Sequence, residues 1–278
     1  MSMTPETWLG AHPYLEPVAR FCAAVDEALA DLPVSSPAVP SWNEHTPDFE
    51  AGLPVLHSEA LAVDLSSGGA LALALVERLS AGPGAGALAA DARRLAAGLA
   101  REPDAPRRIA AWLLGDDGLA PAAPGLLRFL GWRALARSLA PLVAAFAAWR
   151  NDERWQRGYC PVCGNRPAMA QLIGVDPGRK RFLWCGCCGA RWRYVRTACP
   201  FCEANDQRLG VVSVEGERNL RIDFCEECRG YLKTYNGAGD EAMWLADWTT
   251  LHLDVIAQER GLNRDSASLF ELEPELHP

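Results

Sequence analysis

The sequence has no long hydrophobic run, although 49% of its 278 residues are apolar and 22% are charged. Its most apolar stretch, residues 138–149, directly follows Arg137 and is shorter than the roughly 20 residues needed to cross a bilayer. We therefore expect no membrane span. Residues 1–8 also lack a basic segment followed by an apolar run, so we expect no secretory signal and a cytoplasmic protein.

Sequence signs of catalysis are also missing. The five histidines are scattered without ligand spacing to one another, and no nucleophile lies in a recognisable motif with a base. His252, in a segment expected to be helical, is interpreted as structural. The sequence therefore predicts a protein that is not an enzyme.

The charge of the chain is unevenly distributed. The net charge of −8 disfavours a general nucleic-acid binder. Residues 150–235 nevertheless carry 15 Lys and Arg against 10 Asp and Glu, whereas the rest of the chain carries 12 against 25. The same basic window holds nine of the ten cysteines. The tenth, Cys22, lies beside Phe21 on an apolar helix face and is expected in the core.

Eight of the nine clustered cysteines form four C-x-x-C pairs. They are Cys160 and Cys163, Cys185 and Cys188, Cys199 and Cys202, and Cys225 and Cys228. In a reducing cytosol such pairs are typical of metal ligands, because disulfide scaffolds are shorter and exported. A single C-x-x-C is equally compatible with a redox dithiol. Four pairs in two matched sets favour two metal sites, each with four cysteine ligands.

The cysteine region contains an internal repeat. The segment Cys160-Pro-Val-Cys163 recurs 39 residues later as Cys199-Pro-Phe-Cys202, and 21 or 22 residues separate the two pairs within each unit. Strands are expected at 168–173, 182–184, 209–214 and 220–224, with a turn inside each unit. Each unit is too small for a hydrophobic core, so a bound metal would supply on the order of 10 kcal/mol of its folding free energy.

The repeat favours tandem pairing, in which each unit closes its own site, over a cross-braced arrangement that joins 160/163 to 199/202. Tetrahedral thiolate suits either zinc or a single iron, and the sequence does not separate them. Gly164 and Gly189 follow the second cysteine of their pairs, where a positive φ lets backbone N–H groups point at thiolates. Glu203 and Arg229 stand at these places in the second unit.

Two further features of the window have competing interpretations. Cys187 is expected to point away from the metal, with an alternative ligand or reactive thiol as the second interpretation. Arg191 and Arg193 alternate with Trp192 and Tyr194, which predicts a solvated face with the rings packed inward. The alternative is a docking surface for an acidic partner or nucleic acid.

The chain as a whole is expected to be an α+β protein. Residues 1–155 form an Ala- and Leu-rich domain of five to seven helices, followed by four-cysteine modules at 156–196 and 197–236. Residues 237–278 form a C-terminal helix, from about Asp240 to Arg260, and an acidic tail at 271–275. One side of this helix is expected to dock on the ribbons or the helical domain, through Trp244, Trp248, Leu251 and Val255.

The cysteine motifs resemble those of the formate dehydrogenase accessory protein family, FdhE. The resemblance is carried by Cys160-Pro-Val-Cys163-Gly, the 21-residue gap and Cys185-x-x-Cys188, by Val195-Arg-x-x-Cys199-x-x-Cys202, and by Cys225-x-x-Cys228 with the following Tyr231-Leu-Lys233. The helical first half and the C-terminal helix are also similar to that family, whereas Cys187 and the acidic tail depart from its pattern.

The resemblance implies a cytoplasmic maturation factor that binds the catalytic subunit of respiratory formate dehydrogenase before export. It implies rubredoxin-like iron sites held by the eight paired cysteines, with zinc as the alternative occupant. A homodimer is possible, and nucleic acid is an unlikely partner. Two other hypotheses are a zinc-ribbon nucleic-acid binder and an electron carrier or dithiol oxidoreductase.

Overall fold

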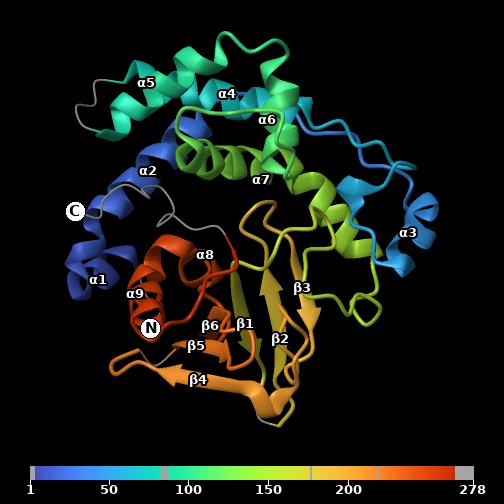
Figure 1. The fold of residues 1–278 in the computed structure, drawn as a ribbon, viewed down its shortest axis with the longest axis vertical. Coiled ribbons are helices and arrows are strands. Elements are labelled where there is room, and N and C mark those ends of the chain that lie inside the picture. The colour runs from blue at the N-terminus through green and yellow to red at the C-terminus, as the bar shows by residue number, and fades with distance from the viewer. Residues whose placement is uncertain (1–3, 83–86, 176, 218, 267–278) are drawn as a thin grey trace.

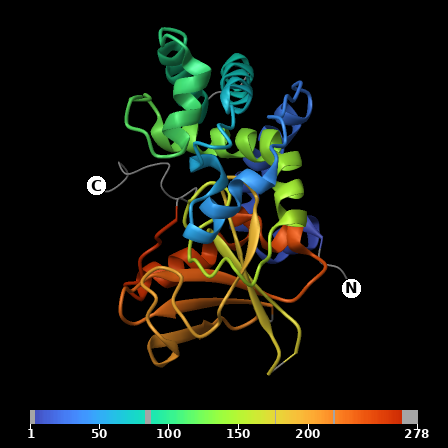
Figure 2. The ribbon, with the colours of Figure 1, turned by 90° about the vertical axis from the view of Figure 1, so that its right-hand side faces the viewer.

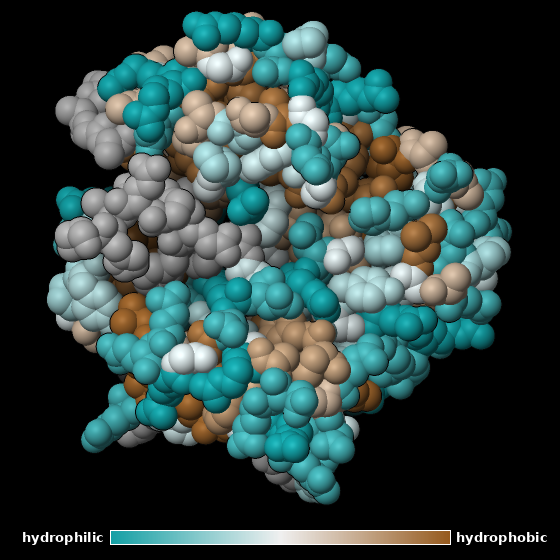
Figure 3. Space-filling view, in the orientation of Figure 1, coloured by the Kyte–Doolittle hydropathy of each residue, from teal (hydrophilic) through white to brown (hydrophobic). Residues whose placement is uncertain are grey.

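A computed structural model describes residues 4–82, 87–175, 177–217 and 219–266. A helical part forms one half of the molecule and a twisted sheet the other, with the C-terminal helices against the sheet (Figures 1 and 2). Hydrophilic side chains cover much of the face seen in Figure 3, and hydrophobic ones gather in separate patches. The expected α+β architecture is confirmed. The acidic tail at 271–275 lies outside the described residues.

The helical part contains seven described α-helices, the upper end of the expected number. They are α1 (Pro5–Ala11), α2 (Glu16–Ala30), α3 (Thr46–Ala51), α4 (Ser66–Ala81), α5 (Ala87–Leu99), α6 (Ala105–Leu113) and α7 (Pro124–Trp149). Helix α4 packs on α6 and α7, and its Gly69 allows close approach, because a Cβ there would lie 1.8 Å from the carbonyl oxygen of Pro106. Cys22 on α2 is buried, as predicted. Within the described residues, no helix has the length and hydrophobicity needed to span a bilayer.

The two cysteine units share one six-stranded sheet within the described residues. Its strands are β1 (Met169–Ile173), β2 (Lys180–Trp184), β3 (Arg191–Tyr194), β4 (Leu209–Ser213), β5 (Leu220–Cys225) and β6 (Tyr231–Asn236). The strand order is β3-β2-β1-β6-β5-β4. Each unit contributes an antiparallel set of three strands, and the sets join where β1 pairs in parallel with β6, with Met169 opposite Lys233.

The C-terminal helix is confirmed, but it does not run unbroken from Asp240 as predicted. The segment forms a short helix α8 (Glu241–Trp244), a 3-10 turn (Asp247–Thr250) and helix α9 (Leu251–Glu259). The hydroxyl of Thr249 donates to the carbonyl oxygens of Met243 and Ala246, and this side-chain bonding competes with helical hydrogen bonds. The docking face also differs from the prediction, because Val255 is 43% exposed and Leu253 is fully buried.

A buried ionic network fastens the C-terminal segment to β6. The ammonium of Lys233 donates to Asp254 at 2.7 Å and also to Asp247, and both the Lys233 and the Asp254 side chains are 1% exposed. Arg264 donates to Asp247, and the hydroxyl of Tyr231 donates to Asp254. Burial alone would raise the pKa of Asp247, but the charges of Arg264 and Lys233 outweigh it and hold that pKa below its usual range.

Replacing the lysine of this network should strongly destabilise the fold. In a Lys233→Ala variant the Asp254 carboxylate loses its ammonium partner, and breaking a buried ion pair typically costs about 3–5 kcal/mol of unfolding free energy. The control is Lys180→Ala, at an exposed strand position, which should change that free energy by less than about 0.5 kcal/mol. Urea denaturation measures both, and equal effects would contradict a structural role for the network.

Candidate metal centres

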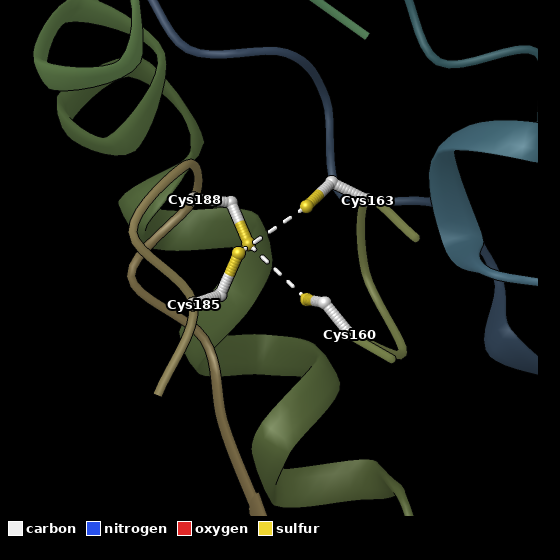
Figure 4. A group of neighbouring side chains, drawn as sticks. All are labelled: Cys160, Cys163, Cys185 and Cys188. Carbon is white, nitrogen blue, oxygen red and sulfur yellow. Dashed lines mark hydrogen bonds between the residues drawn. The ribbon is translucent and has the colours of Figure 1, made fainter. Parts of the chain in front are cut away.

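The first group of cysteines brings four sulfur atoms together at the junction with the helical part. Cys160 and Cys163 lie in the loop before β1, and Cys185 and Cys188 lie in the turn between β2 and β3, with their sulfurs facing one another (Figure 4). The Sγ–Sγ distance is 3.5 Å between Cys160 and Cys188 and 3.4 Å between Cys163 and Cys185. All four residues are buried.

The second group repeats this arrangement at the outer half of the sheet. Cys199 and Cys202 precede β4, and Cys225 and Cys228 lie at the turn between β5 and β6. The paired Sγ–Sγ distances are both 3.7 Å. A tetrahedral ion bound to sulfur at 2.3 Å requires sulfurs about 3.8 Å apart, so the geometry suits one such ion. Each unit therefore assembles its own four cysteines, which confirms tandem rather than cross-braced pairing.

The two units build their cysteine turns with the same backbone geometry. Gly164 and Gly189 adopt positive φ values of 78° and 72°, as predicted. Glu203 and Arg229 adopt the same left-handed conformation, with φ of 63° and 61°, although a side chain makes this conformation costly. The second unit therefore adopts the same left-handed turn without glycine.

Backbone N–H groups point at the sulfurs in both units. The N–H groups of Val162, Phe201 and Gly230 each lie 3.4 Å from a cysteine sulfur, namely that of Cys160, Cys199 and Cys228 respectively. Such N–H contacts orient thiolate ligands and stabilise their charge. Burial raises the pKa of Cys160 and of Cys188, so ionising all four thiols of the first group requires a cation among them.

The environments of the two groups differ. The first group belongs to the same hydrophobic core as the helices, and its loop is bonded to the helical part, since the N–H groups of Val55 and Leu56 donate to Pro161 and Val162. In the second group Cys202 is exposed and Cys228 is partly exposed. The first group is thus enclosed by protein, whereas the second meets solvent.

A surface groove connects the two groups. One cysteine of each group, Cys163 and Cys202, lies on its wall, together with His57, Arg166 and Phe201. The pKa of each of these two cysteines is lowered. Hydrogen bonds from Cys160 and its neighbours lower the pKa of Cys163, and for Cys202 such bonds outweigh the opposing effect of burial. The C-x-x-C pattern identified the cysteines, but nothing in the spacing of His57 or Arg166 indicated this groove.

The other residues singled out in the sequence take ordinary positions. Cys187 belongs to neither group of four, and its fully buried thiol interacts with Cys163, which raises the pKa of Cys187. Trp192 and Tyr194 are buried, as predicted, while Arg193 pairs with Glu153 and Arg191 lies over the ring of Phe182. The two arginines therefore have partners within the chain.

The two groups should respond differently to loss of one thiol. A Cys185→Ser variant removes a thiol from the enclosed group and should lower the unfolding midpoint markedly, since that group is part of the core. A Cys202→Ser variant should lose one bound metal ion per chain with a smaller effect on that midpoint. Elemental analysis and thermal denaturation measure these effects, and equal destabilisation by both variants would contradict the assignment.

Comparison with known proteins agrees with this architecture. The chain is 33% identical to a protein FdhE homolog of Pseudomonas aeruginosa over 92% of this chain and 83% of that protein. It is 30% identical to a protein FdhE homolog of Stutzerimonas stutzeri, over 92% and 82% of the two chains. The crystal structure of the FdhE protein from Pseudomonas aeruginosa superposes with a TM-score of 0.61 at 25% identity, covering 94% of this chain and 90% of that one. No protein-family model matches the sequence. On the strength of the two homologues, the chain belongs to the FdhE family.

Proposed function

We propose that this protein is a cytoplasmic maturation factor that binds the catalytic subunit of respiratory formate dehydrogenase before export and is not itself an enzyme. The observation that carries the proposal is the asymmetry of the two cysteine groups, one enclosed and one open to solvent beside a groove. An enclosed group suits a structural role, and an open one suits contact with a partner. Family membership supports formate dehydrogenase as that partner.

The eight paired cysteines are proposed to hold two mononuclear metal ions, iron as the preferred occupant and zinc as the alternative. The four-sulfur geometry suits either ion. Iron in such a site adds the ability to cycle between Fe²⁺ and Fe³⁺, whereas zinc holds the turn in shape. We also propose the domain boundaries at 155/156, 196/197 and 236/237, with the two ribbons joined in one sheet.

The surface around the second group has the composition of a docking site. A pocket beside Cys199 and Cys225 is lined by Phe201, Phe224 and Val211, and Val211 is 52% exposed. Exposed apolar side chains in a hollow are typical of protein contacts. The arginines of β3 are occupied within the chain, which disfavours the nucleic-acid alternative.

The proposal is tested by affinity capture of the tagged protein from its own cells grown on formate. Wild type should recover the catalytic subunit of a formate dehydrogenase, and a folded Cys202→Ser variant should recover at least tenfold less. The control is Cys22→Ala, which removes a buried thiol outside both groups and should capture as wild type does.

Two results would contradict the proposal. Recovery of nucleic acid without any dehydrogenase would assign the ribbons to phosphate binding, and such binding would weaken steeply with salt. Equal capture by wild type and Cys202→Ser would remove the second cysteine group from the interaction.

A further inference from the structure

Three side chains from distant parts of the sequence meet away from both cysteine groups. His12 ends helix α1, Glu217 lies in the turn between β4 and β5, and His252 lies in helix α9. Their ligand atoms all lie within 4.8 Å of one another. The site therefore joins the N-terminal helix, the second ribbon and the C-terminal helix.

The distances match those around a transition-metal ion. The Nε2 atom of His12 lies 3.0 Å from Oε1 of Glu217, and Nε2 of His252 lies 3.1 Å from the same oxygen. An ion bound at about 2.0 Å places neighbouring nitrogen and oxygen ligands roughly 3 Å apart. Two imidazoles and one carboxylate are a donor set used by zinc and by non-haem iron.

The hydrogen bonds of His12 favour a cation over a simple contact. Its Nδ1 lies 3.1 Å from the carbonyl oxygen of Trp8, and a carbonyl only accepts, so Nδ1 carries the proton. In a neutral ring Nε2 is then unprotonated, and its lone pair faces the Glu217 carboxylate. A proton or a metal ion has to lie between these two acceptors. Donation from the other ring nitrogen to a backbone carbonyl is also the usual support of a metal-bound histidine.

The position of His252 distinguishes a shared proton from a bound metal ion. A proton shared by His12 and Glu217 satisfies those two groups but leaves His252, whose two buried ring nitrogens make no well-aligned hydrogen bond within the described residues. An ion at the centre takes lone pairs from both imidazoles and from the carboxylate.

Neighbouring aromatic side chains hold the three proposed ligands in place near the protein surface. The ring of Trp8 stacks on His12 at 3.7 Å, and its Nε1 donates to the carbonyl oxygen of Thr249. The His12, Glu217 and His252 side chains are 14%, 9% and 11% exposed. Tyr14, whose ring is edge-on to both imidazoles, is 57% exposed, so the site lies close to the protein surface on that side.

We propose that His12, Glu217 and His252 form a third metal site, which binds a divalent transition-metal ion through two imidazole nitrogens and one carboxylate oxygen. Its ligands are harder than thiolates, so it differs in kind from the cysteine groups and does not depend on their occupant. Three protein ligands leave a coordination position for water or for a group from outside the chain. The bound ion would cross-link α1 and α9 to the second ribbon.

Metal counting on the full chain tests the site. Protein is dialysed to equilibrium against buffered, micromolar free Zn²⁺, and iron and zinc per chain are measured together by elemental analysis. Wild type should hold three ions, and Glu217→Gln and His12→Gln should each hold two. The control is Glu215→Gln, which makes the same charge change at an exposed position in the same turn and should still hold three.

Cobalt identifies the ligands that hold the third ion. With the cysteine groups filled by zinc, added Co²⁺ should give wild type visible bands without sulfur-to-cobalt charge transfer, and these bands should be absent from Glu217→Gln. A wild-type count of two ions, a third ion retained by both variants, or sulfur-to-cobalt bands from the third ion would each overturn the proposal. Circular dichroism before metal addition establishes that each variant compared is folded.

Discussion

Charge repulsion among thiolates is the constraint on which this structure depends. Each unit gathers four sulfur atoms into a space where their paired distances are 3.4 to 3.7 Å, and in the first unit all four cysteines are buried. Four buried negative charges are not stable there without a cation. The local turns, the N–H groups directed at sulfur and the hairpins that bring each second pair toward the first all suit the binding of one such cation.

The repeat in the sequence produced two sites of unequal character because their neighbours differ. The first unit is bonded to the helical part through Val55 and Leu56 and shares its core. The second unit is joined to the first through the pairing of β6 with β1. The ionic network of Lys233 and the contacts of α1 and α9 join it to the two ends of the chain. The first unit is therefore part of the main core, whereas the second unit keeps one cysteine at the surface.

The cysteine spacing predicted both groups of four, and the periodicity of apolar residues predicted the helical first half. The parallel pairing of β1 with β6 was not predictable, because alternation within each unit says nothing about which edges meet. The break in the C-terminal helix depends on hydrogen bonds of Thr249 and on partners of Asp247 from other segments. His12, Glu217 and His252 carry no sequence signal, since 205 residues separate the first two and no spacing links either to the third.

The parallel junction between β1 and β6 has a consequence for synthesis of the chain. The four cysteines of the first unit leave the ribosome before those of the second, so that unit is able to fold first. Strand β1 then remains an open sheet edge until residues 231–236 emerge to pair with it. An unpaired edge is prone to join other chains. Biogenesis therefore contains an interval of exposure whose length is set by translation of the second ribbon.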